Sequence, residues 1–154
     1  MDLSDLIQVP AIMPGLKANS KKQLLQLLSE RAAAMTGIPE REIFDTVVQR
    51  EKLGSTGVGN GIAIPHGKLP GVQQITGVFA RLDSPVDFES LDDQPVDLVF
   101  LLLAPEGAGA DHLKALSRIA RILRDGETAA KVRGTRDAAA IHALLAITPA
   151  SHAA

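Results

Sequence analysis

The stretch from Val96 to Leu103 constrains the fold of this chain more than any other part of the sequence. Its residues are apolar apart from Asp97, and a near-continuous apolar run of this length is typical of a β-strand covered on both faces. The longest uninterrupted apolar run, residues 98–104, is far shorter than the about 20 residues that a membrane-spanning helix needs. We therefore expect this segment to lie inside the sheet of a globular protein.

Helical patterns precede this strand. Ser20 and Gln23 have the spacing of a capping box, in which each side chain bonds the backbone N–H of the other residue. Apolar residues recur at helical spacing after them. Gly37 suits a left-handed helix end, and Pro39 suits the first turn of a second helix that should end near residues 50–53. These signals predict two consecutive helices ahead of the strand.

Further elements complete the pattern. Asp111 is a candidate cap for a helix over residues 111–124, and a last helix is expected over residues 136–145. Shorter extended segments are expected within residues 1–18 and at 62–64, 75–82 and 86–88, whereas the glycine-rich segment 54–61 is expected to have no regular structure. Helices and strands in mixed order around a buried strand indicate an α/β fold, a sheet layered with helices.

The length of the chain suits a single domain. Its 154 residues are the usual size of one core, which we place at residues 1–147, followed by a loose tail at 148–154. Residues 1–5 show neither a basic segment nor a long apolar stretch. We therefore see no signal peptide and expect a cytoplasmic protein with no membrane insertion.

Composition narrows the possible functions. Sixteen basic and eighteen acidic residues give a net charge of −2, which argues against a nucleic-acid surface. All four aromatic residues are phenylalanines in apolar surroundings, so we expect them in the core rather than as stacking platforms for bases. The absence of cysteine excludes disulfides, thiolate metal ligands and thiol catalysis.

One histidine has neighbours that suggest chemistry. The segment directly upstream of His66, residues 54–61, contains four glycines and two hydroxyl side chains, and glycine allows backbone N–H groups to converge on an anion. Imidazole is nucleophilic near neutral pH because its pKa of about 6.5 leaves one nitrogen unprotonated. His66 is therefore a candidate phosphoryl acceptor. The candidate phosphoryl-cradling residues are Ser55, Thr56, Gly57 and Gly59.

Plainer explanations compete with this one. The segment lacks the ending of a Walker motif and the glycine spacing of the dinucleotide fingerprint, so a mobile connection remains an alternative. The histidine and cysteine pairs of zinc sites are absent, and we expect no metal and no cofactor. No Gly-x-Ser-x-Gly elbow of a serine hydrolase occurs. His142 and His152 have no suggestive neighbours and are interpreted as boundary or solvated residues.

Two residues could assist His66. His112 lies in the first turn of its expected helix, where the helix dipole lowers its pKa, and on the apolar face of that helix. It is either a satisfied core histidine or a donor to a phosphoryl oxygen. Arg50 lies directly before the glycine-rich segment, and its planar donors match phosphate oxygens. The alternative for Arg50 is a surface ion pair with Glu51 or Asp45.

A family resemblance lies in the segment from Arg50 to Lys68. Its sequence, REKLGSTGVGNGIAIPHGK, resembles the signature of the enzyme IIA proteins of the phosphoenolpyruvate-dependent phosphotransferase system, fructose/mannitol type. Residues 111–120, DHLKALSRIA, resemble the second histidine segment of that family, and residues 94–100, QPVDLVF, resemble its central strand. As a free-standing chain, the sequence is most similar to the nitrogen-regulatory branch. The loop at residues 105–110 is richer in glycine and alanine than we expect for the family.

The resemblance implies a fold, a site and partners. The fold would be a single α/β domain, a mixed, mostly parallel sheet of about five strands with helices on both faces. His66 would be phosphorylated on Nε2, with His112 and Arg50 assisting. The donor would be an HPr-like phosphocarrier protein, itself loaded from phosphoenolpyruvate through an enzyme I. In the nitrogen-regulatory branch, the phosphorylation state is a signal to potassium transport, sensor kinases and nitrogen or carbon metabolism.

Transfer between two proteins requires an accessible acceptor. We therefore expect a shallow depression with an apolar rim, for which the candidates are Val58, Ile62, Leu69 and Val72. Two other functions stay open. One is a sugar-specific IIA component that passes phosphate to a IIB domain, and the other is a non-catalytic binding module in which His66 is structural. The downstream partner and the oligomeric state are not determined by the sequence.

Overall fold

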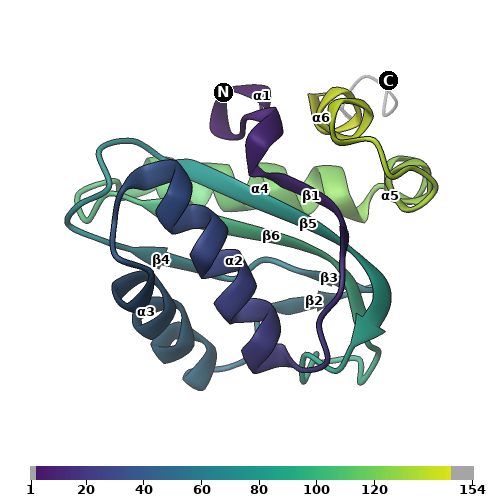
Figure 1. Cartoon of the computed structure of the whole chain (residues 1–154), viewed down its shortest axis with the longest axis horizontal. Helices are drawn as coiled ribbons and strands as arrows, with labels where there is room; N and C mark the ends of the chain where they lie inside the picture. Colours follow the sequence, from purple (N-terminus) through teal and green to yellow (C-terminus); the bar gives the residue numbers. More distant parts are fainter. Residues whose placement is uncertain (1–2, 147–154) are drawn as a thin grey trace.

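The computed structural model describes residues 3–146, which form a six-stranded sheet between layers of helices (Figure 1). The strands are β1 (Ile12–Leu16), β2 (Gly57–Gly59), β3 (Ile62–Ala63), β4 (His66–Lys68), β5 (Thr76–Val86) and β6 (Val96–Ala104). Their order is β1-β5-β6-β3-β2, and β4 pairs with β6 outside this path. Three pairs are parallel (β1–β5, β3–β6 and β4–β6), and β5–β6 and β2–β3 are antiparallel. The predicted mixed, mostly parallel sheet is confirmed, with one strand more than expected.

The central strand is β6, as its apolar run predicts. β5 pairs with one edge of β6, and β3 and β4 pair in succession with the other. Every residue of β6 except Asp97 is buried. The Asp97 carboxylate lies 2.9 Å from Nε of Arg133, so the single charge of the strand is paired. The sequence interpretation of this segment is therefore confirmed.

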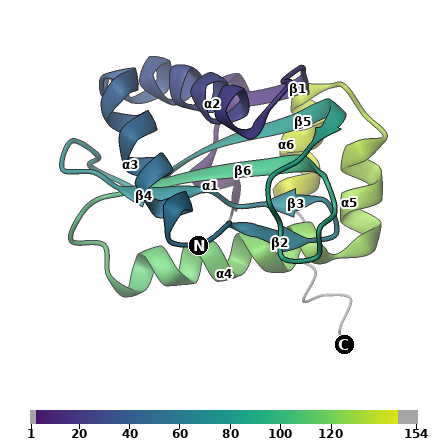
Figure 2. The ribbon, with the colours of Figure 1, turned by 90° about the horizontal axis from the view of Figure 1, so that it is seen from below.

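Helices cover both faces of the sheet, as Figure 2 shows. α2 (Lys21–Thr36) and α3 (Glu40–Lys52) lie on one face, and α4 (Ala110–Arg124) lies on the other. The remaining helices are α1 (Leu3–Leu6), the 3-10 helix η1 (Val9–Ala11), α5 (Gly126–Arg133) and α6 (Ala138–Ala146). None of the helices in this part of the chain is long and apolar enough to cross a membrane.

The ends of α2 and α3 follow their sequence signals closely. Oγ of Ser20 accepts the N–H of Gln23 at 3.1 Å, which is half of the predicted capping box. The other half differs, because the Gln23 side chain accepts the N–H of Asn19 at 2.6 Å rather than that of Ser20. Gly37 ends α2 with a φ of 79°, and Pro39 is the cap of α3 rather than part of its first turn. α3 ends at Lys52, within the predicted range.

The helices after the sheet differ more from the prediction. Asp111 is not the cap of α4, because the helix already begins at Ala110 and is preceded by Gly109, whose φ of 52° favours glycine. α5 was not predicted, although Asp125 caps it by accepting the N–H of Thr128 at 3.1 Å. α6 begins two residues later than expected. Short helices of this kind have too few apolar repeats to be recognised from periodicity.

The glycine-rich segment was predicted to lack regular structure, and this is wrong for Gly57–Gly59. These residues form β2, which is antiparallel to β3. The turn between the strands has a positive φ at both Asn60 (58°) and Gly61 (80°), as the favoured two-residue hairpin turn requires. The Asn-Gly pair is itself a hairpin signal, so the sequence carried the evidence for this turn.

Other strand boundaries also differ. β4 was not predicted, because three residues after a proline give little pattern to recognise. The segments 75–82 and 86–88, expected as separate strands, contribute to the single strand β5, whose pairing with β6 shifts register between Arg81 and Val86. Residues 1–18 contain the expected short strand, β1, and also α1 and η1, which were not expected.

Three of the four phenylalanines are fully buried, as predicted: Phe79, Phe88 and Phe100. Phe44 is only partly buried and packs against the edge of the core. The predicted tail at residues 148–154, with His152, lies outside the described residues.

Candidate functional site

His66 is the first residue of β4, at the edge where β3 and β4 follow one another along β6. Pro65 separates these two short strands, and its carbonyl accepts the N–H of Leu102 at 3.0 Å. The backbone directly before the histidine is therefore tied to the central strand. The His66 side chain itself is only partly buried. The sheet holds the ring in one position while part of it stays accessible.

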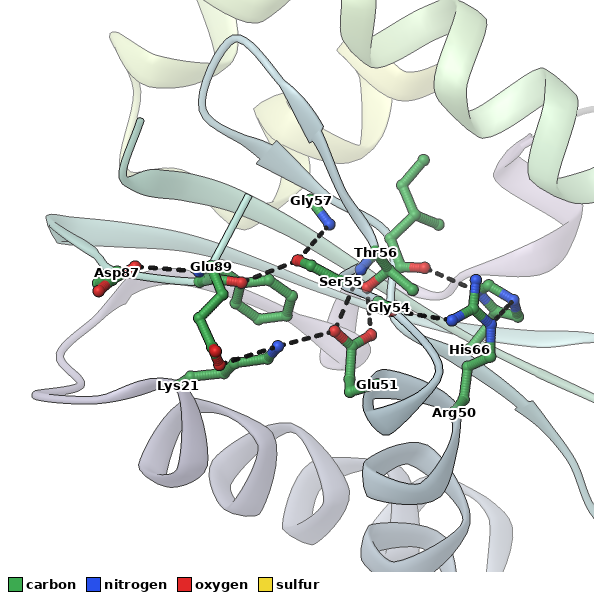
Figure 3. Close-up of polar contacts among 12 residues, drawn as sticks. Lys21, Arg50, Glu51, Gly54, Ser55, Thr56, Gly57, His66, Asp87 and Glu89 are labelled. Carbon is green, nitrogen blue, oxygen red and sulfur yellow. Dashed lines mark hydrogen bonds and ion pairs between the residues drawn. The ribbon is translucent and has the colours of Figure 1, made fainter. Parts of the chain in front are cut away.

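The two ring nitrogens of His66 have different partners, which Figure 3 shows. Nδ1 lies 2.9 Å from the carbonyl oxygen of Ile64, which can only accept, so Nδ1 carries the ring proton. Nε2 lies 3.3 Å from Nε of Arg50, which can only donate, so Nε2 presents its lone pair. This tautomer makes Nε2 the nucleophilic nitrogen of the neutral ring.

Arg50 reaches the ring from the last turn of α3. Its Nη1 also donates to the carbonyl oxygen of Gly54 at 2.9 Å, so the guanidinium is held at two points. The sequence left open an ion pair with Glu51 or Asp45, but both carboxylates bind other cations. The structure therefore brings Arg50 to His66, with donors on the side of the ring that carries the lone pair.

His112 is the third residue of α4, and its ring lies beside that of His66. The ring centroids are 5.4 Å apart and the planes meet at 73°, an edge-to-face contact. The side chain points inward, as predicted, and is buried. Its Nε2 has no hydrogen-bond partner among the described residues. A buried nitrogen without a partner is unusual, so His112 is not the satisfied core histidine that the sequence left open.

The pKa of His66 is lowered from the ordinary value of 6.5, mainly because burial disfavours the charged ring. The positive charge of Arg50 lowers the pKa further, while the hydrogen bond to Ile64 and the negative charge of Glu51 act in the opposite direction. The neutral form of His66 is thereby favoured near pH 7. A neutral ring is the form that can act as a nucleophile.

The pKa of His112 is lowered as well. Burial is the main cause, and the charges of His66 and Lys68 add to it. The direction agrees with the prediction from the helix position of His112, but its causes are burial and the neighbouring charges rather than the helix dipole. Both histidines therefore favour the uncharged form, and the charged form of His66 disfavours protonation of His112.

The predicted cradle residues are bonded within the protein. Oγ of Ser55 donates to the carbonyl of Phe88 at 2.8 Å and accepts the N–H of Gly57 at 3.1 Å. Gly59 pairs with Ile62 in the β2–β3 hairpin. These hydroxyl and backbone groups already have partners within the protein. Their role in cradling a phosphoryl group stays a prediction.

Thr56 and Glu51 form a buried polar cluster that sequence reasoning did not single out. The Thr56 N–H donates to Oε1 of Glu51 at 3.1 Å, and the Thr56 hydroxyl donates to Oε2. Nζ of Lys21 lies 3.0 Å from Oε1 of Glu51 and 3.6 Å from Oε1 of Glu89. A glutamate at the end of a helix, between an arginine and a lysine, gives no pattern that distinguishes burial from exposure.

The predicted apolar rim is mostly wrong. Three of its four candidates are buried in the core: Ile62, Leu69 and Val72. Val58 stays at the surface, and two other apolar side chains are far more exposed, Leu53 at 84% and Leu113 at 69%. Leu53 directly follows α3, which carries Arg50, and Leu113 directly follows His112. Their sequence positions next to site residues were the signal that could have identified them.

The other predicted minor sites have simple structural accounts. His142 is partly buried, and its Nε2 lies 3.0 Å from the carbonyl oxygen of Ile7, so it is a boundary residue as predicted. Within residues 3–146, no cluster of three or more histidine, aspartate or glutamate side chains has the arrangement of a metal site.

Known proteins resemble this chain along almost its full length. Residues 5–147 match the sequence profile of the family described as "Phosphoenolpyruvate-dependent sugar phosphotransferase system, EIIA 2". A nitrogen regulatory protein of Bradyrhizobium diazoefficiens is 63% identical, over 99% of this chain and 100% of that protein. A nitrogen regulatory protein of Escherichia coli K12 is 39% identical, over 88% of this chain and 84% of that protein.

Solved structures share the fold as well. The nitrogen regulatory protein IIA-Ntr from Neisseria meningitidis superposes with a TM-score of 0.89 at 34% identity, over 93% of this chain and 98% of that one. Enzyme IIAMTL from Escherichia coli, in its complex with phosphorylated enzyme IIBMTL, superposes with a TM-score of 0.78 at 25% identity, over 92% and 99% of the two chains. Sequence and fold therefore point to the same group of proteins.

Proposed function

Because this chain belongs to the EIIA 2 family of the phosphoenolpyruvate-dependent sugar phosphotransferase system, we propose that it is a phosphoryl carrier whose acceptor atom is Nε2 of His66. Members of this family are phosphotransfer components that interact with phosphocarrier donors and downstream partners. The phosphorylated protein would then act as a regulator of other proteins.

The environment of Nε2 carries the proposal. The carbonyl of Ile64 holds the proton on Nδ1, so the lone pair is on Nε2 before any donor arrives. The guanidinium of Arg50 lies against that same nitrogen. A nucleophile next to a fixed, planar cation is the arrangement that phosphoryl transfer needs, because the transferred group carries its negative charge on peripheral oxygens.

The transfer step needs no proton to cross between the proteins. The lone pair of Nε2 attacks the phosphorus of the donor's phosphohistidine in line, and a P–Nε2 bond forms as the donor's P–N bond breaks. The electrons of the broken bond return to the donor's imidazole. Nδ1 of His66 keeps its proton and its bond to Ile64 throughout. The protein contributes position and charge rather than covalent chemistry.

Two neighbours have roles in this step. Arg50 releases the lone pair of Nε2 as the phosphorus approaches, so that the lone pair is free to attack, and its donors turn to the phosphoryl oxygens and neutralise part of their charge. His112 supplies a nearby ring whose Nε2 lacks a partner, and it donates a hydrogen bond to a phosphoryl oxygen. The loop residues Ser55 and Thr56 stabilise the backbone around the site through their hydrogen bonds to Phe88, Gly57 and Glu51.

The regulatory part of the proposal rests on the relatives. The protein that is 63% identical over 99% of this chain is named a nitrogen regulatory protein. We infer that this chain is a cytoplasmic carrier of the same kind, loaded by an HPr-like phosphocarrier. Its phosphorylation state would then report to regulated proteins such as sensor kinases or potassium transport components.

A second candidate function is sugar-specific transfer to a IIB domain. It is favoured by the likeness to enzyme IIAMTL, which was solved with phosphorylated enzyme IIBMTL. The chemistry at His66 would be the same in both cases, and only the acceptor of the phosphoryl group would differ. Because the identity to the nitrogen regulatory proteins is higher, we propose this function second.

Intact mass after incubation with phosphoenolpyruvate, enzyme I and an HPr-like carrier tests the proposal. We expect the mass of one phosphoryl group to be added, and to be lost in acid, because the P–N bond of a phosphohistidine is acid-labile. His66→Ala should add nothing, and His142→Ala, which alters a histidine remote from the site, should be labelled as the parent protein is. No added mass on the parent protein, with the carrier shown to be charged, would instead favour a binding module.

A further inference from the structure

Glu51 is a buried carboxylate for which the transfer step described above has no use. Its side chain is only 5% exposed, yet it accepts from three donors: Nζ of Lys21, and the N–H and hydroxyl of Thr56. A buried charge is costly unless it is well paired, and these three donors supply the pairing. Glu51 lies directly after Arg50 in α3, one residue from the guanidinium that contacts His66.

One chain of contacts runs from Glu51 to the protonated nitrogen of His66. The carboxylate holds Thr56 at both its N–H and its hydroxyl. The Thr56 carbonyl in turn accepts the N–H of Ile64 at 3.0 Å. The Ile64 carbonyl accepts Nδ1–H of His66 at 2.9 Å. The residue that fixes the tautomer of His66 is therefore itself fixed by Glu51 through Thr56.

A second, shorter chain runs from Glu51 to the nucleophilic nitrogen. Arg50 precedes Glu51 in the last turn of α3 and donates to Nε2 of His66 at 3.3 Å. It also donates to the carbonyl of Gly54, whose own N–H donates to the backbone carbonyl of Glu51 at 3.1 Å. The first chain starts at the carboxylate of Glu51 and the second at its backbone carbonyl, and the two end on opposite nitrogens of His66. Figure 3 shows the contacts of Glu51 with Thr56 and of Arg50 with Gly54 and His66.

We propose that Glu51 is a positioning residue for phosphoryl transfer, because its carboxylate fixes Thr56 and thereby holds the Ile64 carbonyl on Nδ1 of His66, on the side of the ring opposite Arg50. The inference rests on the proposed function and extends it to a residue that does not touch the phosphoryl group. A displacement of about 1 Å in a reacting group can cost about 100-fold in rate, so a carboxylate that fixes the Nδ1 side of the His66 ring through Thr56 and Ile64 has a kinetic effect without being a catalytic residue.

The charge of Glu51 affects the pKa of His66, and this effect distinguishes a positioning role from a simple loss of structure. The negative charge of Glu51 raises the pKa of His66, while burial and the positive charge of Arg50 lower it. The other charged or titratable groups near the pair are His112, Lys68 and, around Glu51 itself, Lys21 and Glu89. Removal of the charge from Glu51 should therefore lower the pKa of His66 further.

The test compares Glu51→Gln with Asp45→Asn in the full chain. Asp45 is a matched control, because it is an acidic residue on the same helix whose carboxylate, among residues 3–146, bonds only the exposed side chain of Arg41. We expect Glu51→Gln to slow phosphorylation of His66 by the charged HPr-like carrier about 10- to 100-fold, with little change in the KM for the carrier. Asp45→Asn should react as the parent protein does.

An NMR titration of His66 in the same proteins separates positioning from stability. Glu51→Gln should shift the titration of His66 to lower pH, and the acid limb of the rate profile should shift with it. A variant that is merely less stable would lose amplitude with no shift of either curve. Unchanged rate and unchanged titration in a folded Glu51→Gln protein would overturn the inference, whereas a parent protein that accepts no phosphoryl group would overturn the proposed function instead.

A second pair of variants decides the matter if Glu51→Gln does not fold. Thr56→Val removes the hydroxyl that donates to Glu51 but keeps the shape and the backbone N–H, and Thr56→Ser restores the hydroxyl. The proposal predicts slower transfer for the valine variant, by about tenfold, and recovery in the serine variant. Equal rates for the valine variant and the parent protein would contradict it.

Discussion

The two edges of the central strand β6 are built in opposite ways. On one edge, the 11-residue strand β5 pairs with β6 along most of the length of β5. On the other, β3 and β4 contribute only two and three residues, with Pro65 between them. The continuous edge carries two fully buried rings, Phe79 and Phe100, with centroids 6.2 Å apart. Beside the interrupted edge, two histidine rings with lowered pKa values lie 5.4 Å apart.

The difference shows what an interruption in a sheet can supply. In a continuous ladder, the backbone carbonyls that face a neighbouring strand are used to pair the strands. Ile64 lies between β3 and β4, so its carbonyl can bond the side chain of His66 instead. The continuous edge therefore provides stability, and the interrupted edge provides a fixed tautomer and an accessible nitrogen. Changes at one edge should affect stability, and changes at the other should affect transfer.

Loss of the acceptor on the interrupted edge has the largest expected effect. His66→Ala should reduce phosphorylation by more than about 1,000-fold, because no other nitrogen has the same partners. The free energy of unfolding should change little, since the ring is only partly buried. Time-resolved mass measurement and urea denaturation of the same sample give both numbers. A His66→Ala variant that is labelled at the parent rate would contradict the assignment of the acceptor to the interrupted edge.

Removal of a ring from the continuous edge should give the opposite result. Phe100→Ala should cost about 3–5 kcal/mol of stability, because the side chain is fully buried and leaves a cavity. Phe44→Ala is the matched control and should cost less, because Phe44 is only partly buried. Urea denaturation measures both. Equal losses for the two variants would show that β6 is not the centre of stability.

Arg50→Lys tests the geometry of the guanidinium. Lysine keeps the charge but cannot contact both Nε2 of His66 and the Gly54 carbonyl through a planar fork. We expect transfer to slow by about 10- to 100-fold with stability nearly unchanged, as measured by single-turnover phosphorylation. A fully active lysine variant would mean that charge alone suffices at this edge.

His112→Ala should have a smaller kinetic effect. The acceptor nitrogen remains, so labelling should still reach one phosphoryl group, but about tenfold more slowly, because one donor to the phosphoryl oxygens is lost. His112→Gln, which restores a donor, should recover part of the rate. The same single-turnover assay applies, and an alanine variant as fast as the parent would remove His112 from the site.

The smallest expected effect is a pH dependence of stability. Both histidines have a lower pKa in the folded protein than the ordinary value of 6.5, so the unfolded chain binds more protons than the folded one. Stability should be full above about pH 6.5 and should fall as the pH drops toward the lowered values. Urea midpoints at about pH 7.5 and about pH 5.5 measure this. His112→Ala should flatten the slope, and an unchanged slope would contradict the assigned shifts.

The fold was predictable where the sequence has long, regular patterns. The apolar run of β6, the capped start of α2 and the glycine stop at Gly37 gave their elements within a residue or two. β4 and α5 were missed because three and eight residues offer too little periodicity. The hairpin at Asn60 and Gly61 was not predicted although its signal is present, because glycine is unfavourable in strands and the segment contains four glycines.

The site was predictable as a set of residues but not as a network. The family resemblance and the setting of His66 selected it together with His112 and Arg50, and the structure brings all three together. The role of Glu51 in the geometry could not be read from the sequence, because Lys21 reaches it only when α2 packs beside α3, and Thr56 reaches it only when the loop after α3 turns back. The apolar rim failed for a similar reason, since Ile62, Leu69 and Val72 are covered by elements that are distant in the sequence or lie in the core around β6.

The most direct test of the central claim is a long-range ¹H–¹⁵N correlation of the histidine rings in the phosphorylated protein. The geometry predicts a phosphoryl group on Nε2 of His66 and a proton retained on Nδ1, which still bonds Ile64. A phosphoryl group on Nδ1, or on any other residue, would contradict the claim that the interrupted edge of β6 selects the acceptor nitrogen.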